Sequence, residues 1–162
     1  MREILFRGKS VNDGNWVQGS LVVTTIEPSA DNPIKHYHIE DMTIGVFPNG
    51  FQSGLSETVD PETVGQFTGL TDKNGKKIFE GDIVRHYNNG CDVSAFEVGA
   101  IRWNEKYACF ERTSLPGTVR VHDECRYEVI GNIYDNPEIL ANNTNDHSFN
   151  KKTPISGCVE FG

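Results

Sequence analysis

Two histidines are the first side chains in this sequence whose types and spacing suggest metal chemistry. His36 and His38 lie two residues apart in a run typical of a β-strand. Both would leave the same face of that strand, where they could supply two ligands of a zinc site. A third ligand would have to come from a distant part of the chain, and the candidates are His86, His122 and Cys125. Because this spacing matches no compact zinc motif, we expect no bound metal.

Glu80 and Asp82 form a pair of carboxylates separated by one glycine. Paired carboxylates can bind a metal or share a proton. An aspartate beside a turn glycine more often accepts hydrogen bonds from the backbone of its own turn, and we favour that structural role. A metal-dependent hydrolase that uses this pair with a histidine is the least favoured alternative.

Nucleophilic catalysis lacks a recognisable motif in this sequence. There is no G-x-S-x-G motif, and the glycine-rich central stretch lacks the G-x-x-x-x-G-K-[ST] spacing of a phosphate-binding loop. We therefore predict no catalytic residues, no cofactor and no enzymatic activity.

A cluster of aromatic and basic residues is the strongest candidate for a binding surface. Arg102, Trp103 and Tyr107 lie close together in the chain, and Phe110 follows them. Aromatic rings beside cations can stack a base or a nucleotide. Because side chains alternate across a strand, some of these rings must enter the core, and we expect this of Trp103. Arg102, Trp103 and Tyr107 are the predicted ligand-binding residues.

The charge of the chain excludes one class of partner. The net charge is −8, and binding to duplex nucleic acid depends on cations that displace counterions. We therefore expect no duplex nucleic acid as a partner. A local basic face could form only from a scattered set that we interpret as solvated surface charge: Arg85, Arg102, Lys106, Arg112, Arg120 and Arg126.

Several features of composition predict a cytoplasmic protein. No stretch approaches the roughly 20 apolar residues that span a bilayer. The amino terminus carries an acid where a targeting segment would carry positive charge. Cys91, Cys109, Cys125 and Cys158 form no C-x-x-C pair, so we expect free thiols.

Short apolar runs broken by turn residues predict a mostly β protein. The sixteen glycines indicate many turns. Asp13-Gly14 and Asn74-Gly75 supply the dipeptides typical of tight β-hairpin turns. The predicted strands and their connections lie at 4–23 (a hairpin), 34–40, 43–47, 64–79 (a hairpin), 98–103, 107–111, 119–121 and 127–134, with a hinge at 51–62.

These elements divide into three predicted segments. Residues 1–58 form an amino-terminal β-hairpin unit, and residues 59–140 form a small bent sheet or SH3-like barrel. Asn136-Pro137 begins a single helical turn that ends at Leu140. Residues 141–162 are polar and aperiodic, and we predict a flexible tail.

Three stretches of this sequence resemble the YopX family of phage and prophage proteins. They follow in the order of the family pattern: residues 6–19 (FRGK, then DG and WVQG), residues 61–84 (PETVGQFTGLTDKNGKKIFEGDIV) and residues 128–138 (EVIGNIYDNPE). The resemblance covers residues 1–140, which could then form one compact YopX-like domain.

This resemblance implies a phage or prophage origin, a bacterial host cell and a homo-oligomer, and it brings no activity or catalytic residues. We therefore predict a non-catalytic accessory protein that binds a host protein or a small nucleotide-like ligand. A β-barrel protein that binds single-stranded nucleic acid is the alternative.

Overall fold

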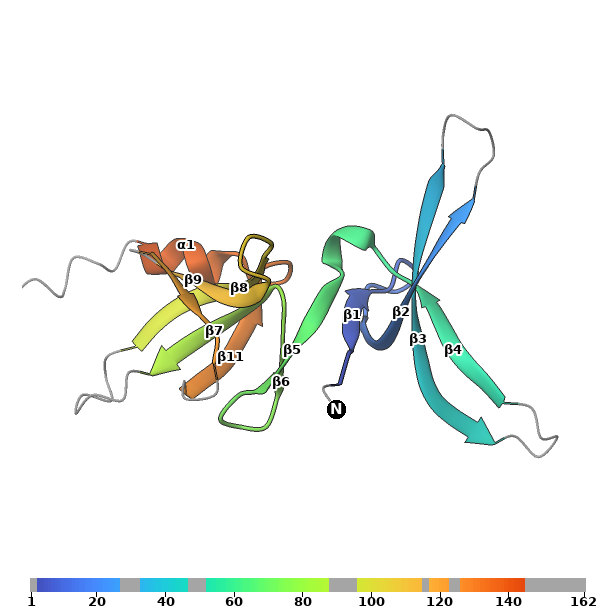
Figure 1. The fold of residues 1–162 in the computed structure, drawn as a ribbon, viewed down its shortest axis with the longest axis horizontal. Helices are drawn as coiled ribbons and strands as arrows, with labels where there is room; N and C mark the ends of the chain where they lie inside the picture. Colours follow the sequence, from blue (N-terminus) through green and yellow to red (C-terminus); the bar gives the residue numbers. More distant parts are fainter. Residues whose placement is uncertain are drawn as a thin grey trace, which may run out of the picture.

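The described residues are mostly antiparallel β-strands, as the sequence predicts (Figure 1). The computed structural model describes residues 3–26, 33–46, 52–87, 96–114, 117–122 and 126–144. The elements are β1 (Phe6–Lys9), β2 (Trp16–Ile26), β3 (Ile34–Val46), β4 (Gln52–Thr58), the 3-10 helix η1 (Pro61–Thr63), β5 (Gly65–Thr71), β6 (Lys77–Phe79), β7 (Asp82–Tyr87), β8 (Phe96–Asn104), β9 (Cys109–Ser114), β10 (Gly117–Arg120), β11 (Arg126–Asn132) and the α-helix α1 (Glu138–Thr144).

The strands form two sheets that lie next to each other in Figure 1. One sheet has the order β4-β3-β2-β1-β5-β6, and the other has the order β10-β9-β8-β7-β11. β5 and β6 therefore belong to the same sheet as the amino-terminal strands, whereas the sequence placed them in the second predicted unit, residues 59–140. Among the described residues, no helix is both long enough and apolar enough to cross a membrane.

The first hairpin forms where the sequence predicts it. β1 pairs with β2, and Gly14 adopts a φ of 72° in the turn between them. The Asp13 carboxylate accepts a hydrogen bond from the backbone N–H of Asn15 at 3.0 Å, which fixes this turn.

Two long antiparallel strand pairs of the first sheet, β2–β3 and β3–β4, form two-stranded ribbons. β2 pairs with β3 from Ser20–Glu40 to Ile26–Ile34, and β3 continues into a second ribbon with β4. The predicted hinge at 51–62 is wrong, because residues 52–58 are a strand. Their Gly- and Ser-rich composition carries no strand signal of its own, and pairing with β3 supplies the backbone hydrogen bonds that make them a strand.

The turn between β5 and β6 closes the free edge of β11. The Asp72 carboxylate accepts hydrogen bonds from the backbone N–H groups of Asn74 and Lys76, at 2.8 and 2.9 Å, and from that of Val129 at 3.0 Å. Burial acts to raise the pKa of Asp72, but these three donors together hold it below its usual value. One side chain thus fixes both the hairpin turn and its contact with the second sheet.

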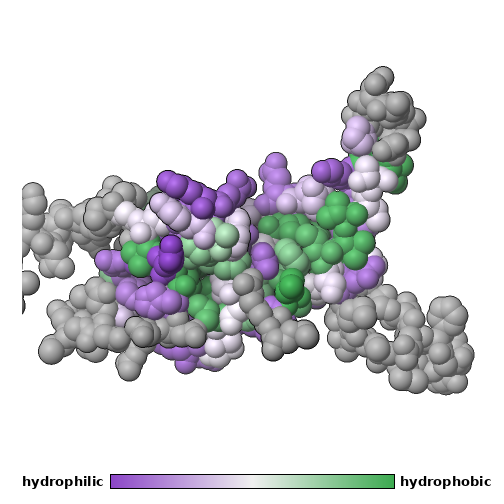
Figure 2. Space-filling view, viewed as in Figure 1, coloured by the Kyte–Doolittle hydropathy of each residue, from purple (hydrophilic) through white to green (hydrophobic). Residues whose placement is uncertain are grey.

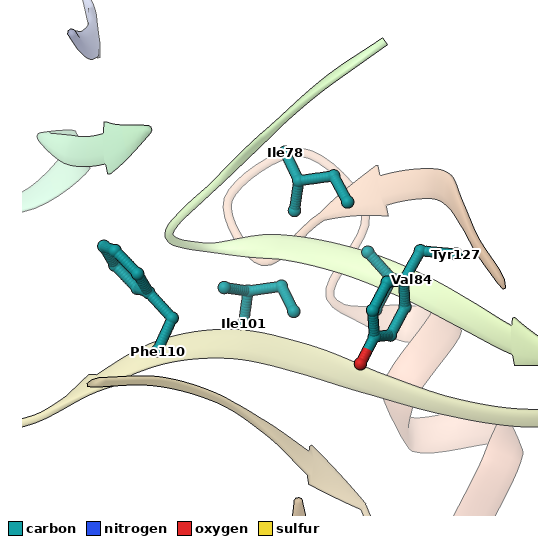
Figure 3. Packing of buried hydrophobic residues seen from close by; sticks show 5 residues of the cluster. All are labelled: Ile78, Val84, Ile101, Phe110 and Tyr127. Carbon is teal, nitrogen blue, oxygen red and sulfur yellow. The ribbon is translucent and has the colours of Figure 1, made fainter. Parts of the chain in front are cut away.

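The hydrophobic core lies between β6 and the five-stranded sheet (Figure 3). Ile78 of β6 packs with Val84, Ile101, Phe110 and Tyr127, which come from four strands of the second sheet. The core therefore joins both sheets, because Ile78 belongs to the first sheet and its partners to the second.

The helix after the second sheet is longer than predicted. It runs over Glu138–Thr144 and not only to Leu140, since no Gly or Pro follows Leu140 to end it. The prediction of a flexible tail from residue 141 is therefore wrong for residues 141–144. Residues 145–162, together with Cys91, Cys125 and Cys158, lie outside the described residues. Cys109 is a free thiol, as predicted.

Candidate functional site

All three residues predicted to bind a ligand are exposed, Arg102 and Trp103 near the end of β8 and Tyr107 in the turn between β8 and β9. Trp103 is 38% exposed, and its ring meets Phe110 edge-on with the centroids 5.0 Å apart. Its backbone N–H donates to the Glu80 carboxylate at 3.0 Å. Trp103 therefore lies at the margin of the core, with one side packed and fixed and the other open to solvent.

Tyr107 is 57% exposed at the tip of the same turn. The side chains of Lys106 and Arg120 approach its ring, at 5.2 and 5.8 Å from the centroid. Its backbone N–H donates to the Asn104 side chain at 3.2 Å, which fixes the start of the turn. Tyr107 thus forms an aromatic–cationic group that the sequence indicated only in part, since Arg120 comes from β10.

Arg102 faces away from Trp103. The two residues are neighbours on β8, so their side chains leave opposite faces of the sheet. Arg102 lies across from Glu111 on β9, and its Nε and Nη2 both lie 2.6 Å from Oε1 of Glu111. The Asn104 amide also donates to Glu111, at 2.7 Å. Hydrogen bonds from Asn104 first, and from Arg102, lower the pKa of Glu111, so this ion pair is fully charged at neutral pH.

A second aromatic–cationic cluster lies on β7, β8 and β11, and the sequence did not reveal it. The Glu128 carboxylate accepts from the Tyr87 hydroxyl at 2.5 Å and pairs with Lys73 at 3.1 Å and Arg85 at 3.3 Å. The Lys73 ammonium lies 4.4 Å from the centre of the Tyr87 ring, and the Arg85 guanidinium lies 4.6 Å from that of the exposed Phe96.

The charges in this second cluster stabilise one another. The hydrogen bond from Tyr87 and the contacts from Lys73 lower the pKa of Glu128, and Glu128 in turn raises the pKa of Lys73. Lys73 and Glu128 are 55 positions apart, so no local spacing could have linked them. The sequence indicates only that Arg85 and Tyr87, two positions apart on one strand, share a face.

The carboxylates of Glu80 and Asp82 bind different partners. Glu80 binds the backbone of Trp103, whereas Asp82 is buried and bonds Arg7 at 2.7 Å and the backbone N–H of Phe79 at 2.8 Å. Burial raises the pKa of Asp82, while Arg7 opposes that shift. Asp82 therefore fixes the corner between β6 and β7, in the structural role favoured from the sequence.

The two histidines of β3 lie on one face of the strand, as the sequence predicts. The rings of His36 and His38 stack with centroids 6.3 Å apart, and His38 Nδ1 lies 3.2 Å from the Thr58 hydroxyl. His86 belongs to the other sheet. Within the described ranges, no three His, Cys, Asp or Glu side chains gather closely enough to hold a metal ion.

The three sequence stretches that resemble the YopX family meet where the two sheets join. Arg7 pairs with Asp82, and Lys9 and the Trp16 indole both contact Asp135. The residues on which the resemblance depends therefore form one continuous structural unit.

Comparison with known proteins identifies the family of the chain. The family model described as YopX protein matches residues 5–141. No curated protein matches the chain. Among solved structures, the chain is similar to the crystal structure of protein EF1440 from Enterococcus faecalis, with 22% identity, a TM-score of 0.43, and coverage of 86% of this chain and 99% of that one. Because the family model spans most of its length, the chain belongs to the YopX protein family.

Proposed function

We propose that this YopX-family protein is a non-catalytic phage or prophage accessory protein that acts in the host cytoplasm by binding a host protein. The observation that carries the proposal is the exposure of two rings, Trp103 near the end of β8 and Tyr107 in the turn that follows. Trp, Tyr and Arg supply most of the binding energy at protein interfaces, especially where neighbouring groups hold them in place. The ring of Phe110 packs edge-on against Trp103, and the side chain of Asn104 fixes the backbone at Tyr107.

A nucleotide-like ligand or a single-stranded nucleic acid is the second candidate. The contact of Tyr107 with Lys106 and Arg120 favours it, because a base can stack on the ring while the cations meet a phosphate. The net charge of −8 counts against a long nucleic acid. If binding to nucleic acid is observed, a steep fall of affinity with salt would support this second candidate.

The proposal is tested by replacing the exposed aromatic residues and measuring the biological effect of each variant. We expect Trp103→Ala and Tyr107→Ala each to weaken the biological effect in host cells, with a loss of about 2 kcal/mol, or about thirtyfold in affinity, for a central interface residue. Val11→Ala is the matched control, since Val11 is an exposed apolar residue on another turn. Folding of each variant is checked by circular dichroism.

The opposite pattern would support an enzyme. A folded His36→Ala or Glu80→Gln variant that loses its effect about a hundredfold, with the Tyr107→Ala variant fully active, contradicts binding as the mode of action.

We further propose that the protein assembles as a homo-oligomer through the ribbon of β2 and β3. Ile26 and Ile34 are exposed and lie directly opposite each other on this ribbon, so they share one of its faces. Figure 2 shows apolar surface at the described end of the ribbon and over the region where β1, β2 and β3 meet. Exposed apolar patches of this kind mark interaction surfaces.

The oligomer is tested by size-exclusion chromatography with light scattering. We expect Ile26→Glu combined with Ile34→Glu to shift the protein to monomers, because two buried charges face each other in the interface. Thr25→Glu, on the opposite face of the same strand, is the control. An unchanged mass for the double variant would exclude this ribbon as the interface.

A further inference from the structure

The structure contains a buried guanidinium with unfilled hydrogen bonds. Arg112 of β9 is 1% exposed and is the largest fully buried side chain among the described residues. Its Nη2 donates to Oε2 of Glu97 on β8 at 2.5 Å. Its Nε and Nη1 are also buried, and neither has a hydrogen-bond partner. A buried guanidinium normally has acceptors for most of its five N–H groups, so these two nitrogens require an explanation.

A half-buried histidine, whose Nδ1 has no hydrogen-bond partner, lies in the same region. His86 of β7 is directly opposite Glu97 in the strand register, and its Nδ1 is buried without an acceptor or donor. Burial first, and then the positive charge of Arg112, lower the pKa of His86. The ring is therefore neutral at pH 7, and its tautomer with a proton on Nδ1 would donate a hydrogen bond.

The backbone of β8 leaves room for the side chain of Arg112. A Cβ at Gly99 would lie 1.8 Å from the backbone oxygen of Thr113 and 2.9 Å from Cγ of Arg112, closer than real atoms approach. The glycine therefore allows β9 to pass close to β8 and leaves space that the stem of Arg112 occupies. Arg112 lies on the same face of β9 as the core residue Phe110, opposite to the face of Glu111.

Glu97 connects this interior to solvent. The side chain of Glu97 is 43% exposed, although the guanidinium that it contacts is buried. The position of its carboxylate is therefore accessible from outside. A carboxylate that is already so well solvated can leave for water at small cost, and a second anion can replace it.

We propose that Arg112 anchors a binding site for the oxyanion of a small ligand, a phosphate or a carboxylate, and that Glu97 occupies this site in the free protein. The incoming oxyanion takes the place of the Glu97 carboxylate on Nη2. Its additional oxygens accept from Nε or Nη1 and from Nδ1–H of His86. The ligand thus fills buried donors that Glu97 leaves open, and this difference drives the exchange. The site is separate from Trp103 and Tyr107, so it does not depend on the proposed partner surface.

Two carboxylate variants give the sharpest test on the full-length protein. Titration calorimetry would measure the affinity for inorganic phosphate and for acetate at constant ionic strength. We expect Glu97→Gln to tighten binding of at least one of them by about tenfold, because the resident competitor is removed. Glu111→Gln is the matched control. It neutralises the partner of Arg102 and lies on β9 beside Arg112, but on the opposite face of that strand, so we expect unchanged affinity.

A variant of the anchor and a direct probe complete the test. We expect Arg112→Gln to abolish binding, and the ¹⁵N signal of the Arg112 Nε–H group in the wild type to shift on addition of the bound anion. Binding of phosphate alone would identify a phosphoryl ligand, and binding of acetate would identify a carboxylate ligand. If Arg112→Gln does not fold, the comparison of Glu97→Gln with Glu111→Gln decides. The proposal is overturned if neither anion binds to the wild type or to Glu97→Gln, or if both glutamate variants tighten binding equally.

Discussion

The Asp135 carboxylate contacts three side chains, two of which come from β1 and β2 near the amino terminus. Its Oδ2 accepts from the Trp16 indole and from the Asn132 amide, each at 2.7 Å, and its Oδ1 pairs with Lys9. The hydrogen bonds from Asn132, Lys9 and Trp16 lower the pKa of Asp135 to about 2. Stabilisation by such a carboxylate is complete above its unfolded pKa, near 4, and is lost as the pH falls toward 2.

The corresponding prediction concerns Asp135→Asn. We expect this variant to be less stable than the wild type at pH 7 and to lose less stability between pH 4 and pH 2, because it lacks the carboxylate that titrates there. Urea unfolding across this range measures the slope. Trp16 emission, followed in a Trp103→Phe background, should shift in the same range only when Asp135 is present. The exposed Glu105→Gln serves as the control, and an acid slope identical in Asp135→Asn and the wild type would contradict the assignment.

At the scale of single elements, the β5–β6 hairpin holds the second sheet as well as its own turn. Gly75 adopts a φ of 81°, and the Asp72 carboxylate next to it bonds both the turn and β11. Residues with a Cβ rarely adopt positive φ, and β-branched residues almost never do. The conformation of this one turn therefore fixes the contact with β11, which is an edge strand of the five-stranded sheet.

We expect Gly75→Val to destabilise the protein by about 1–3 kcal/mol through backbone strain. No atom lies within 4 Å of a Cβ built at Gly75, so steric contact with other residues adds nothing to this cost. Gly117→Val is the matched control, because that glycine also has open space around it and lies in a strand without positive φ. Chemical denaturation compares the two variants. Equal stabilities would show that the turn tolerates a side chain at this position.

At the scale of the whole molecule, a buried ion pair joins the two sheets. Arg7 of β1 bonds Asp82, the first residue of β7, at 2.7 Å, and it donates to the backbone oxygen of Glu80 at 3.2 Å. Its guanidinium lies between two rings, 4.7 Å from the centre of the Trp16 ring and 5.0 Å from that of Phe79. Loss of one partner would leave the other charge buried and unpaired.

We therefore expect Arg7→Met to cost about 3–5 kcal/mol in the free energy of unfolding, because it leaves Asp82 buried without its cation. Adding Asp82→Asn should restore part of this loss, and the double-mutant cycle measures the coupling. Glu3→Gln is the control, since it weakens the exposed pair of Glu3 with Lys77, for which a cost below about 1 kcal/mol is expected. If Arg7→Met and Glu3→Gln cost the same, the two sheets do not depend on the Arg7–Asp82 ion pair.

Local chemistry was sufficient to determine the class of the fold from the sequence. Alternating apolar residues predicted the strands, and Asp13-Gly14 and Asn74-Gly75 predicted two turns that the structure confirms at Gly14 and Gly75. These features depend on a residue and its near neighbours, whose sterics a sequence contains directly. The three stretches that resemble the YopX family predicted the family for the same reason, since their residues and order are visible in the chain.

Only the tertiary structure decided which distant residues meet. Strand 52–58 exists through its pairing with β3, and the Lys73–Glu128 and Arg7–Asp82 ion pairs join positions 55 and 75 residues apart. The energy of each such contact depends on strand register and on exclusion of water, and both arise only when the whole sheet has formed. For this reason the sequence predicted one aromatic–cationic cluster, and the structure added a second one and a buried guanidinium.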